Sequence, residues 1–452
     1  MPDHVVKRGL DIPIKGQATG EAISLELPST VAYAPQEFRG VTAKVAVKVG
    51  EPIRAGQVLF FDKTNPEIVF RSPASGTLKA IERGARRVIV DVVVEVGEGE
   101  PETFEAHSQS QLDGLDADAA RSLALASGMW GALKTRPLDN VPRADARPQA
   151  VVICGSETGP LQPGAEALLD SSDQAALQAA VSLLSKLSDG PVYLTHRAGA
   201  LPPAFSGISG AELHGFSGPH PSGDPALQVN LLCPPRGSGH VWTIRAWDAV
   251  CLGRFALEGR FDTERTYAAV GVGCANPRLV KTLIGAPVQH IVGETLTGEQ
   301  RWIRGSVLTG QAVDGGRWAG FTTRAVHVLP DDVPRFMFGW ALPMIGAWSF
   351  HKAFLSGFTG AGSKKFDLRP GLWGGERAIV PVGYYADVVA TPDIVPDFLF
   401  KSIIAGDLEE SIQLGLLDIT MEEAALCTFI CPSKVEFDVI LRDGLALFEK
   451  EA

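Results

Sequence analysis

The chain lacks the features that mark several classes of protein. No stretch supplies the roughly 20 continuous apolar residues that a membrane helix needs, and the N-terminus "MPDHVVKRGLDIPIKG" has no apolar signal-peptide core. Cysteines are few and scattered, without the spacing of a disulfide framework: Cys154, Cys233, Cys251, Cys274, Cys427 and Cys431. We therefore expect a protein of a reducing cytosol, with neither a signal peptide nor a transmembrane helix.

Basic runs are equally scarce. The formal net charge is −11, and the longest basic clusters are the pairs Lys7-Arg8, Arg86-Arg87 and Lys364-Lys365. A nucleic-acid partner requires a positive surface that displaces counterions, so the sequence argues against that class. At 452 residues, with 45% hydrophobic and 21% charged residues, the chain has the composition and length of a globular protein of two to four domains.

The most apolar segment is "FMFGWALPMIGAWSF", residues 336–350. It is too short to span a bilayer, and Pro343 and two glycines interrupt it. Two interpretations stay open: a buried core segment or hairpin, and an apolar patch that docks against a membrane partner.

Residues 41–96 are typical of short strands joined by tight corners. Val45, Val47 and Val49 alternate with other residues, while "GEPIRAGQ" and "SPASG" provide glycine and proline for turns. The pattern resembles the biotinyl/lipoyl-type barrel-sandwich fold, whose carrier members attach their cofactor to a lysine at a hairpin tip. Lys63 occupies such a tip, but the loop is longer and Pro66 stiffens it. We expect the scaffold without the attached arm.

From residue 150 the pattern becomes α/β. "AVVICGS" and "PVYLTHR" predict strands on either side of a helical stretch, as in a βαβ unit. A dinucleotide-binding turn would carry G-x-G-x-x-G after the first strand. This turn reads "CGSETGPLQPG" instead: Glu157 stands where a phosphate would lie, and Pro160 and Pro163 remove amide donors. The turn therefore predicts no dinucleotide binding there.

Three histidines follow in an irregular stretch, His214, His220 and His240. Their gaps of 6 and 20 residues match no compact metal-ligand spacing, so we expect structural loop histidines rather than a metal site.

The remainder predicts a small α+β unit and then a helical region. Residues 256–330 suit short strands with a helix at "NPRLVKTLIG" (276–285), as in a β-grasp. Further on, Asp393, Asp407 and Thr420 are candidate helix N-caps, and Glu423 would complete a capping box with Thr420.

The predicted fold is therefore multidomain, α/β and α+β. Its expected parts are a barrel-sandwich N-terminal domain (1–100), a Rossmann-like domain without a dinucleotide fingerprint (101–255), a β-grasp domain (256–330) and a mainly helical C-terminal domain (331–452).

Several segments, in order, resemble one family. "KRGLDIPIKG" (7–16), "KTRPLDNVP" (134–142), "GPHPSG" (218–223), "GSVLTG" (305–310) and the long block 374–445 are similar to the A subunit of Na⁺-translocating NADH:quinone reductases. The resemblance runs nearly from end to end. That family's architecture, with a barrel-sandwich, a Rossmann-like, a β-grasp and a helical part, agrees with the parts predicted above.

The resemblance implies a function. The chain would be a peripheral subunit on the cytoplasmic side of the bacterial inner membrane, part of an enzyme but not catalytic alone. Its partners would be the B to F subunits, chiefly the membrane-embedded B subunit, with ubiquinone as a possible substrate. NADH, FAD, FMN, riboflavin and the iron–sulfur centres would belong to partner subunits, and this chain would bind no cofactor or metal.

Cys427 and Cys431 bear on the expectation that this chain binds no iron–sulfur cluster. A cubane cluster needs four thiolates, commonly C-x₂-C-x₂-C-x₃-C-P, and "CTFICP" keeps only the last part of that motif. It resembles the cluster segment of the related C subunit of Rnf complexes without its other cysteines. At i, i+4 the two thiols would share a helical face and pack as small apolar groups. The alternatives are an iron–sulfur or flavin electron-transfer subunit of the Rnf C type, and a biotinyl or lipoyl carrier.

A quinone head needs a flat apolar slot with one or two donors. The resemblance implies that "YAPQEFRG" (33–40) and "WGALKTRPLDN" (130–140) lie around the quinone or inhibitor region. A competing interpretation is that Arg136 only braces its loop against Asp139. The candidate residues are Tyr33, Phe38, Arg39, Trp130, Leu133, Lys134, Arg136 and Asp139.

Overall fold

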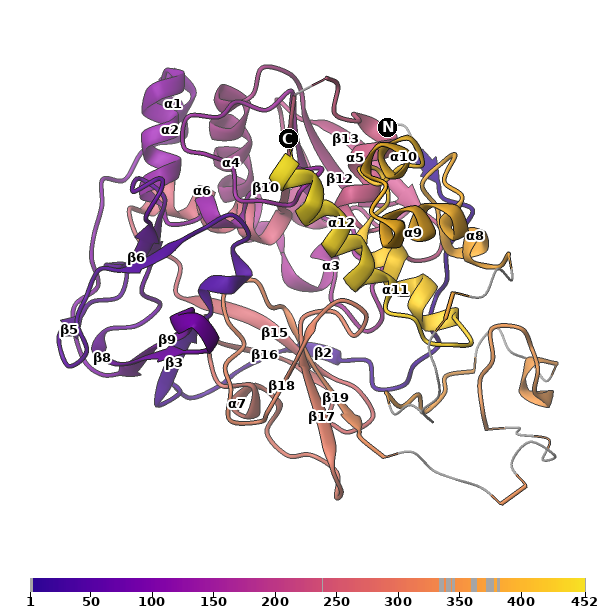
Figure 1. The fold of residues 1–452 in the computed structure, drawn as a ribbon. Helices are drawn as coiled ribbons and strands as arrows, with labels where there is room; N and C mark the ends of the chain where they lie inside the picture. Colours follow the sequence, from indigo (N-terminus) through magenta and orange to yellow (C-terminus); the bar gives the residue numbers. More distant parts are fainter. Residues whose placement is uncertain are drawn as a thin grey trace.

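A computed structural model describes residues 3–237, 239–332, 337–338, 343, 346–358, 364–370, 378–379 and 383–451. The sheets of an N-terminal part, an α/β part and a third, mixed-sheet part pack against one another (Figure 1). The C-terminal helices lie against the α/β part and the mixed-sheet part. No helix in these ranges is both long enough and apolar enough to cross a membrane.

Two small antiparallel sheets form the N-terminal part. One has the order β3 (Thr30–Tyr33), β9 (Ile89–Val96), β8 (Gly76–Arg83), β5 (Pro52–Ile53), and the other has β4 (Ala43–Val45), β6 (Val58–Asp62), β7 (Val69–Arg71). Apolar side chains of both sheets face each other in one core, among them Val31, Leu59, Phe60, Leu78 and Val92, all fully buried. This is the expected barrel-sandwich arrangement.

The turn between β6 and β7 carries Lys63 at an exposed position. Buried Asp62 fixes this turn, because its carboxylate accepts bonds from the backbone N–H of Thr42 (3.0 Å) and Thr64 (3.1 Å) and from Asn65 Nδ2 (3.0 Å). The tip is therefore a braced turn.

The α/β part is a six-stranded sheet in the order β1 (Asp3–Val5), β13 (Glu212–Ser217), β12 (Val192–Arg197), β11 (Ala150–Cys154), β14 (Val241–Arg245), β10 (Lys134–Arg136). Only β10 runs antiparallel to its neighbour. Every residue of β11 is buried because helices cover both faces. Val151 and Ile153 share a core with α4 (Gln174–Leu187) and α6 (Ala246–Glu258), whereas Val152 and Cys154 share one with α5 (Pro225–Leu232).

The third part is a mixed sheet in the order β18 (Gln311–Val313), β17 (Gln300–Arg304), β19 (Ala325–Pro330), β15 (Glu264–Val270), β16 (Arg278–Leu283), β2 (Thr19–Ser24). The predicted helix at 276–285 is wrong, since this stretch is β16. It lies inside the sheet and pairs on both edges, and this tertiary hydrogen bonding overrides its helical spacing. The helix of this part is α7 (Val288–Val292).

Residues 3–24 differ from the predicted division of the chain. β1 extends the α/β sheet beside β13, and β2 extends the mixed sheet beside β16. Both are edge strands whose partners lie far away in sequence, so local pattern could not assign them. The domain boundaries placed after residues 100, 255 and 330 stay predictions.

The C-terminal helices are α8 (Tyr385–Val388), α9 (Pro396–Ala405), α10 (Leu408–Gln413), α11 (Met421–Ile430) and α12 (Phe437–Glu451). Thr420 and Glu423 form the predicted capping box, and Asp407 caps α10 by accepting from Glu410 N–H. The prediction for Asp393 is wrong: Val395 occupies the N-cap of α9, and Asp393 lies in a turn with φ 61°.

Candidate functional site

The two segments predicted to lie together, 33–40 and 130–140, are neighbours in the structure. Val141 N–H, just after the second segment, donates to Arg39 O (2.9 Å), and Lys134 Nζ donates to Glu37 O (3.3 Å). Lys134 Nζ also lies 5.9 Å from the centre of the Phe38 ring. We call this junction the aromatic seam.

The apolar members of the aromatic seam are core residues. Tyr33, Phe38, Trp130 and Leu133 are each no more than 1% exposed. The Phe38 ring centre lies 4.3 Å from that of Phe70, and Trp130 packs edge-on against Trp242 at 5.4 Å. These rings fill the space between them, so they line none of the cavities described below.

The polar members lie at the rim of the seam. Arg136 Nη1 pairs with Asp139 Oδ2 at 3.2 Å, the loop-bracing contact of the competing interpretation, and Arg136 is 3% exposed. Burial lowers the pKa of Lys134, although Asp139 opposes that effect. The rim therefore holds three basic side chains, Arg39, Lys134 and Arg136, beside buried rings.

A residue that sequence reasoning missed closes this rim. Glu449, near the end of α12, accepts from Arg39 Nη2 (3.3 Å) and from Asn140 Nδ2 (2.6 Å), one residue in each segment. The contact spans more than 300 residues of sequence, and no local signal predicts it. The C-terminal helix thus holds both segments at once.

The carboxyl edge of the α/β sheet is where folds of this class bind ligands. The chain runs from β11 to β12 on one side and later returns to β14 on the other, so the strand order reverses between β11 and β14. The loop after β11 and the end of β14 meet at this edge. Glu157, Asp224, Arg245 and Glu422 are among the residues that line a cavity of about 160 Å³ there.

Glu157 lies in the loop after β11, at this edge of the sheet. Its Oε1 accepts from the backbone N–H of Thr158 (2.8 Å) and Gly159 (2.7 Å), and its Oε2 pairs with Arg245 Nη2 at 3.0 Å. Arg245 also donates to the carbonyl oxygens of Ser156 (3.1 Å) and Gly223 (3.2 Å). The chain's own carboxylate therefore uses the amides and the cation that could otherwise hold an anion.

The C-terminal part completes this crevice. His220 Nε2 lies 3.1 Å from Glu422 Oε2, and Thr309 donates to Glu422 Oε1 at 2.6 Å. Burial disfavours both charges, but their mutual contact outweighs it, raising the pKa of His220 and lowering that of Glu422. Burial, reinforced by Glu422, raises the pKa of nearby Asp224 to about 6. Three parts of the chain thus meet in one hydrogen-bonded group, which we call the charged crevice.

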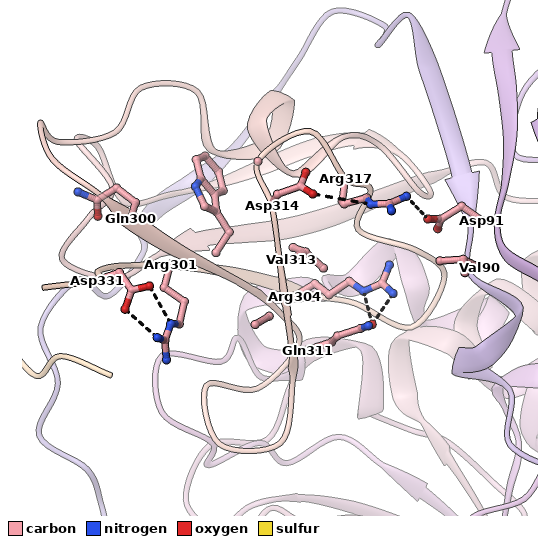
Figure 2. Close-up of a pocket in the computed structure, with 13 residues that line it drawn as sticks. Val90, Asp91, Gln300, Arg301, Arg304, Gln311, Val313, Asp314, Arg317 and Asp331 are labelled. Carbon is pink, nitrogen blue, oxygen red and sulfur yellow. Dashed lines mark hydrogen bonds and ion pairs between the residues drawn. The ribbon is translucent and has the colours of Figure 1, made fainter. Parts of the chain in front are cut away.

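A larger pocket of about 590 Å³ lies between the mixed sheet and β9. Figure 2 shows that its arginines face partners of the same chain: Arg301 Nη2 pairs with Asp331 Oδ1 (2.8 Å), and Arg317 Nη1 with Asp91 Oδ2 (2.9 Å). Arg304 Nε donates to Gln311 Oε1 at 3.1 Å. The pair Arg317–Asp91 joins the mixed sheet to the barrel-sandwich part, and all three contacts already use the cations of the pocket.

Comparisons with known proteins agree with this architecture. Family models described as "NqrA N-terminal barrel-sandwich hybrid domain", "NqrA second alpha/beta domain" and "NQRA C-terminal domain" match residues 4–97, 115–261 and 268–315. The A subunit of the Na(+)-translocating NADH-quinone reductase from Pasteurella multocida (strain Pm70) is 36% identical over 452 residues, covering 99% of each chain. The same subunit from Vibrio atlanticus (strain LGP32) is 36% identical over 449 residues, again covering 99% of each.

This chain belongs to the A-subunit family of Na(+)-translocating NADH-quinone reductases. A member of this family therefore combines a charged crevice with an aromatic seam. The resemblance inferred from its motifs is confirmed, as is the predicted class of fold.

The cysteine pair of this family member is buried in the C-terminal core. Cys427 and Cys431 are both fully buried on α11 and at its end, and Tyr385 Oη donates to Cys431 Sγ at 3.1 Å. Burial raises the pKa of Cys427, which favours the neutral thiol over the thiolate that a metal requires. Both side chains pack as apolar groups, as their spacing predicted.

The three histidines do not converge. His214 lies within β13 and contacts His4 (Nδ1 to Nε2, 3.0 Å), His220 belongs to the charged crevice, and His240 precedes β14. Among the side chains that the structure describes, no group of three His, Cys, Asp or Glu could hold a metal ion.

Proposed function

We propose that this chain is the cytoplasm-facing peripheral subunit of a Na⁺-pumping NADH:ubiquinone oxidoreductase, that it contributes to the quinone or inhibitor region, and that it carries no redox group. Family membership supports a role in such a complex. The observation that carries the finer proposal is the meeting of residues 33–40 and 130–140 in the aromatic seam.

The charged crevice supports the absence of a bound flavin or nucleotide. A phosphate entering beside Glu157 would meet a carboxylate already bonded to Thr158 N–H, Gly159 N–H and Arg245. Repulsion between like charges in this partly buried site opposes its binding. NADH, FAD, FMN, riboflavin and the iron–sulfur centres then belong to the other subunits, and this chain shapes their surroundings.

The aromatic seam supplies the chemistry that a quinone head requires. Phe38 and Trp130 form an apolar layer beneath the rim, and Arg39 and Lys134 would donate to carbonyl oxygens of a quinone that replaced their bonds to Glu449 and Glu37. Because the rings are packed, the quinone head would bind at the rim, beside the end of α12, where Glu449 holds Arg39 and Asn140. Contact with the membrane-embedded B subunit at this rim would bring the quinone to it.

The test uses assembled complexes that carry Phe38→Leu or Arg136→Gln. Phe38→Leu keeps an apolar core group but removes the ring, so we expect a several-fold rise in the KM for ubiquinone and weaker inhibition by quinone-site inhibitors. Phe216→Leu, an equally buried ring in the α/β sheet, is the matched control and should leave both values unchanged. If Phe38→Leu and Arg136→Gln complexes keep wild-type KM and inhibitor sensitivity, the proposed quinone contact is wrong.

A further inference from the structure

The charge of residues 333–366 differs from that of the rest of the chain. This stretch holds none of the 52 Asp and Glu residues, but it contains Arg335, Lys352, Lys364 and Lys365. Eight of its 34 residues are Phe or Trp, about a quarter, compared with 8% aromatic residues in the whole chain. A basic, aromatic, acid-free run in a protein of net charge −11 calls for a physical reason.

Some side chains of this stretch hold it to the body of the protein. The Trp348 ring stacks on Phe429 of α11 at 5.3 Å, and the His351 ring centre lies 3.8 Å from that of Tyr384. Phe366 is 3% exposed, and its N–H donates to Pro13 O at 2.7 Å. Among the described residues of the stretch, Trp348, His351 and Phe366 therefore pack against other parts of the protein.

Other side chains point outward. Met337, Phe338, Leu355 and Phe358 are 85%, 64%, 50% and 75% exposed. Exposed on the same stretch are Lys352, Lys364 and Lys365. In Figure 1 residues 346–358 lie in orange at the lower right edge of the molecule, away from the barrel-sandwich part. These seven exposed residues lie on one stretch of sequence, and we call them the basic aromatic surface. Of the segment 336–350, for which core and docking surface were both open, residues 336, 339–342 and 344–345 lie outside the described residues.

A second exposed apolar group shows why charge matters. Phe398 and Ile404 on α9 are 64% and 60% exposed, but the acidic side chains of Asp397 and Glu409 accompany them on α9 and α10. The basic aromatic surface instead combines exposed rings with lysines on a stretch without carboxylates, and the flanking Asp332 and Asp367 are both paired with Arg369. That combination suits an interface of apolar chains and negative headgroups, where aromatic rings insert and lysines remain at the surface.

We propose that the basic aromatic surface binds the headgroup region of an anionic phospholipid bilayer. Phe338, Leu355 and Phe358 would enter the boundary between headgroups and acyl chains, while Lys352, Lys364 and Lys365 would contact lipid phosphates. This inference rests on the proposed place of the subunit beside a membrane enzyme and adds a direct contact with lipid. The absence of acidic residues follows, since each carboxylate would be repelled by the same headgroups.

Cosedimentation of the purified full chain with vesicles tests the proposal. We expect binding to vesicles of phosphatidylcholine mixed with phosphatidylglycerol, little binding to phosphatidylcholine alone, and a loss of binding as salt is added. The double variant Lys352→Glu/Lys364→Glu should bind more weakly by at least about fivefold for each lysine. Phe358→Ser should lower binding about tenfold, because a buried ring is lost.

Two variants at exposed positions elsewhere serve as controls. Lys63→Glu makes the same charge change on the β6–β7 turn, and Phe398→Ser removes a ring with the same 64% exposure as Phe338. Both should bind like the wild type, and circular dichroism should show all variants folded. Equal losses in the controls, or no difference between the two kinds of vesicle, would overturn the proposal.

A protein partner at this surface predicts a different pattern. The wild type would then bind neither kind of vesicle, and Phe358→Ser would instead prevent assembly with the membrane subunits in detergent. That pair of results would contradict direct contact with lipid. Quinone kinetics of the Phe38→Leu complex remain an independent readout. If vesicle binding fails while that KM still rises, the lipid contact is wrong and the proposed function stands.

Discussion

The charged crevice and the aromatic seam are both places where a ligand would be expected, and the chain closes each with its own side chains. In the crevice, Glu157 bonds two backbone amides and Arg245 at the edge of the α/β sheet. In the seam, Phe38 and Trp130 pack against other rings with almost no exposure. Paired charges fill the crevice, whereas tightly packed aromatic rings fill the seam.

The difference indicates how each region responds to change. A region filled by packed side chains loses stability when a large side chain is replaced by a smaller one, because a cavity remains. A region closed by a charge pair loses most when one partner is removed and the other stays buried alone, and less when both are replaced. Substitutions can therefore distinguish the two kinds of closure.

The largest effect is expected in the aromatic seam. Phe38→Ala should lower the free energy of unfolding by about 3–5 kcal/mol, since it removes a 1% exposed ring between Phe70 and Phe321. Phe38→Leu should cost clearly less. Urea denaturation of the purified chain measures both. A loss below about 1 kcal/mol for Phe38→Ala would mean that the ring is not part of the core.

The charged crevice should respond to its pair as a unit. Arg245→Met should cost about 3 kcal/mol, because Glu157, whose side chain is only 11% exposed, loses its cation. Adding Glu157→Gln should restore much of that loss, because the carboxylate that pairs directly with Arg245 is then replaced by a neutral amide. The same denaturation experiment compares the single and double variants. Additive losses would contradict closure by charge pairing.

A smaller effect is expected where α11 meets the crevice. Thr420 accepts from Glu423 N–H and begins the helix that carries Glu422. Thr420→Ala should cost about 1–2 kcal/mol and Thr420→Ser much less, since serine keeps the capping oxygen. Thermal unfolding monitored by circular dichroism checks this order; equal melting temperatures would exclude the cap as a contributor.

The smallest expected effect is a pH dependence of the crevice. His220 has a raised pKa in the folded chain, so its pairing with Glu422 stabilises fully below the ordinary histidine pKa and is lost as the pH rises through the folded value. Glu422, whose pKa is lowered, loses its contribution only in acid. Asp224 has a raised pKa of about 6 in the folded chain. Its contribution to stability is therefore present below the ordinary aspartate pKa and is lost as the pH rises from there to about 6.

Stability should therefore be greater at a pH below the ordinary histidine pKa of about 6.5 than at a pH above the raised pKa of His220. His220→Gln removes the titrating group and should show a smaller fall over the same range. Urea midpoints at the two pH values, measured for both proteins, decide the matter. The same pH dependence in wild type and variant would assign the effect to other groups.

The sequence predicts what depends on local pattern. The strand before Glu157, the helical spacing of Cys427 and Cys431, and the capping box of Thr420 follow from side-chain periodicity and hydrogen-bonding chemistry within a few residues. The carboxylate of Glu157 is also predicted to take the place of a phosphate, because the turn lacks the glycines that would admit one.

The rest depends on contacts between distant segments. Residues 278–283 have helical spacing but become β16, since the sheet supplies partners on both sides. Glu449 reaches Arg39 and Asn140, and Glu422 reaches His220, across 200 or more residues. Burial of Phe38 and Trp130 likewise arises from packing, so the sequence could place them together but could not show that their rings fill the seam.

The most direct measurement is the visible absorption spectrum of the purified full chain, with its iron and flavin content. We predict a colourless protein without stoichiometric iron or flavin, because Glu157 and Arg245 satisfy each other in the crevice and burial favours the neutral thiol of Cys427. A yellow or brown protein with one flavin or iron cluster per chain would contradict this prediction and favour an electron-transfer subunit of the Rnf C type.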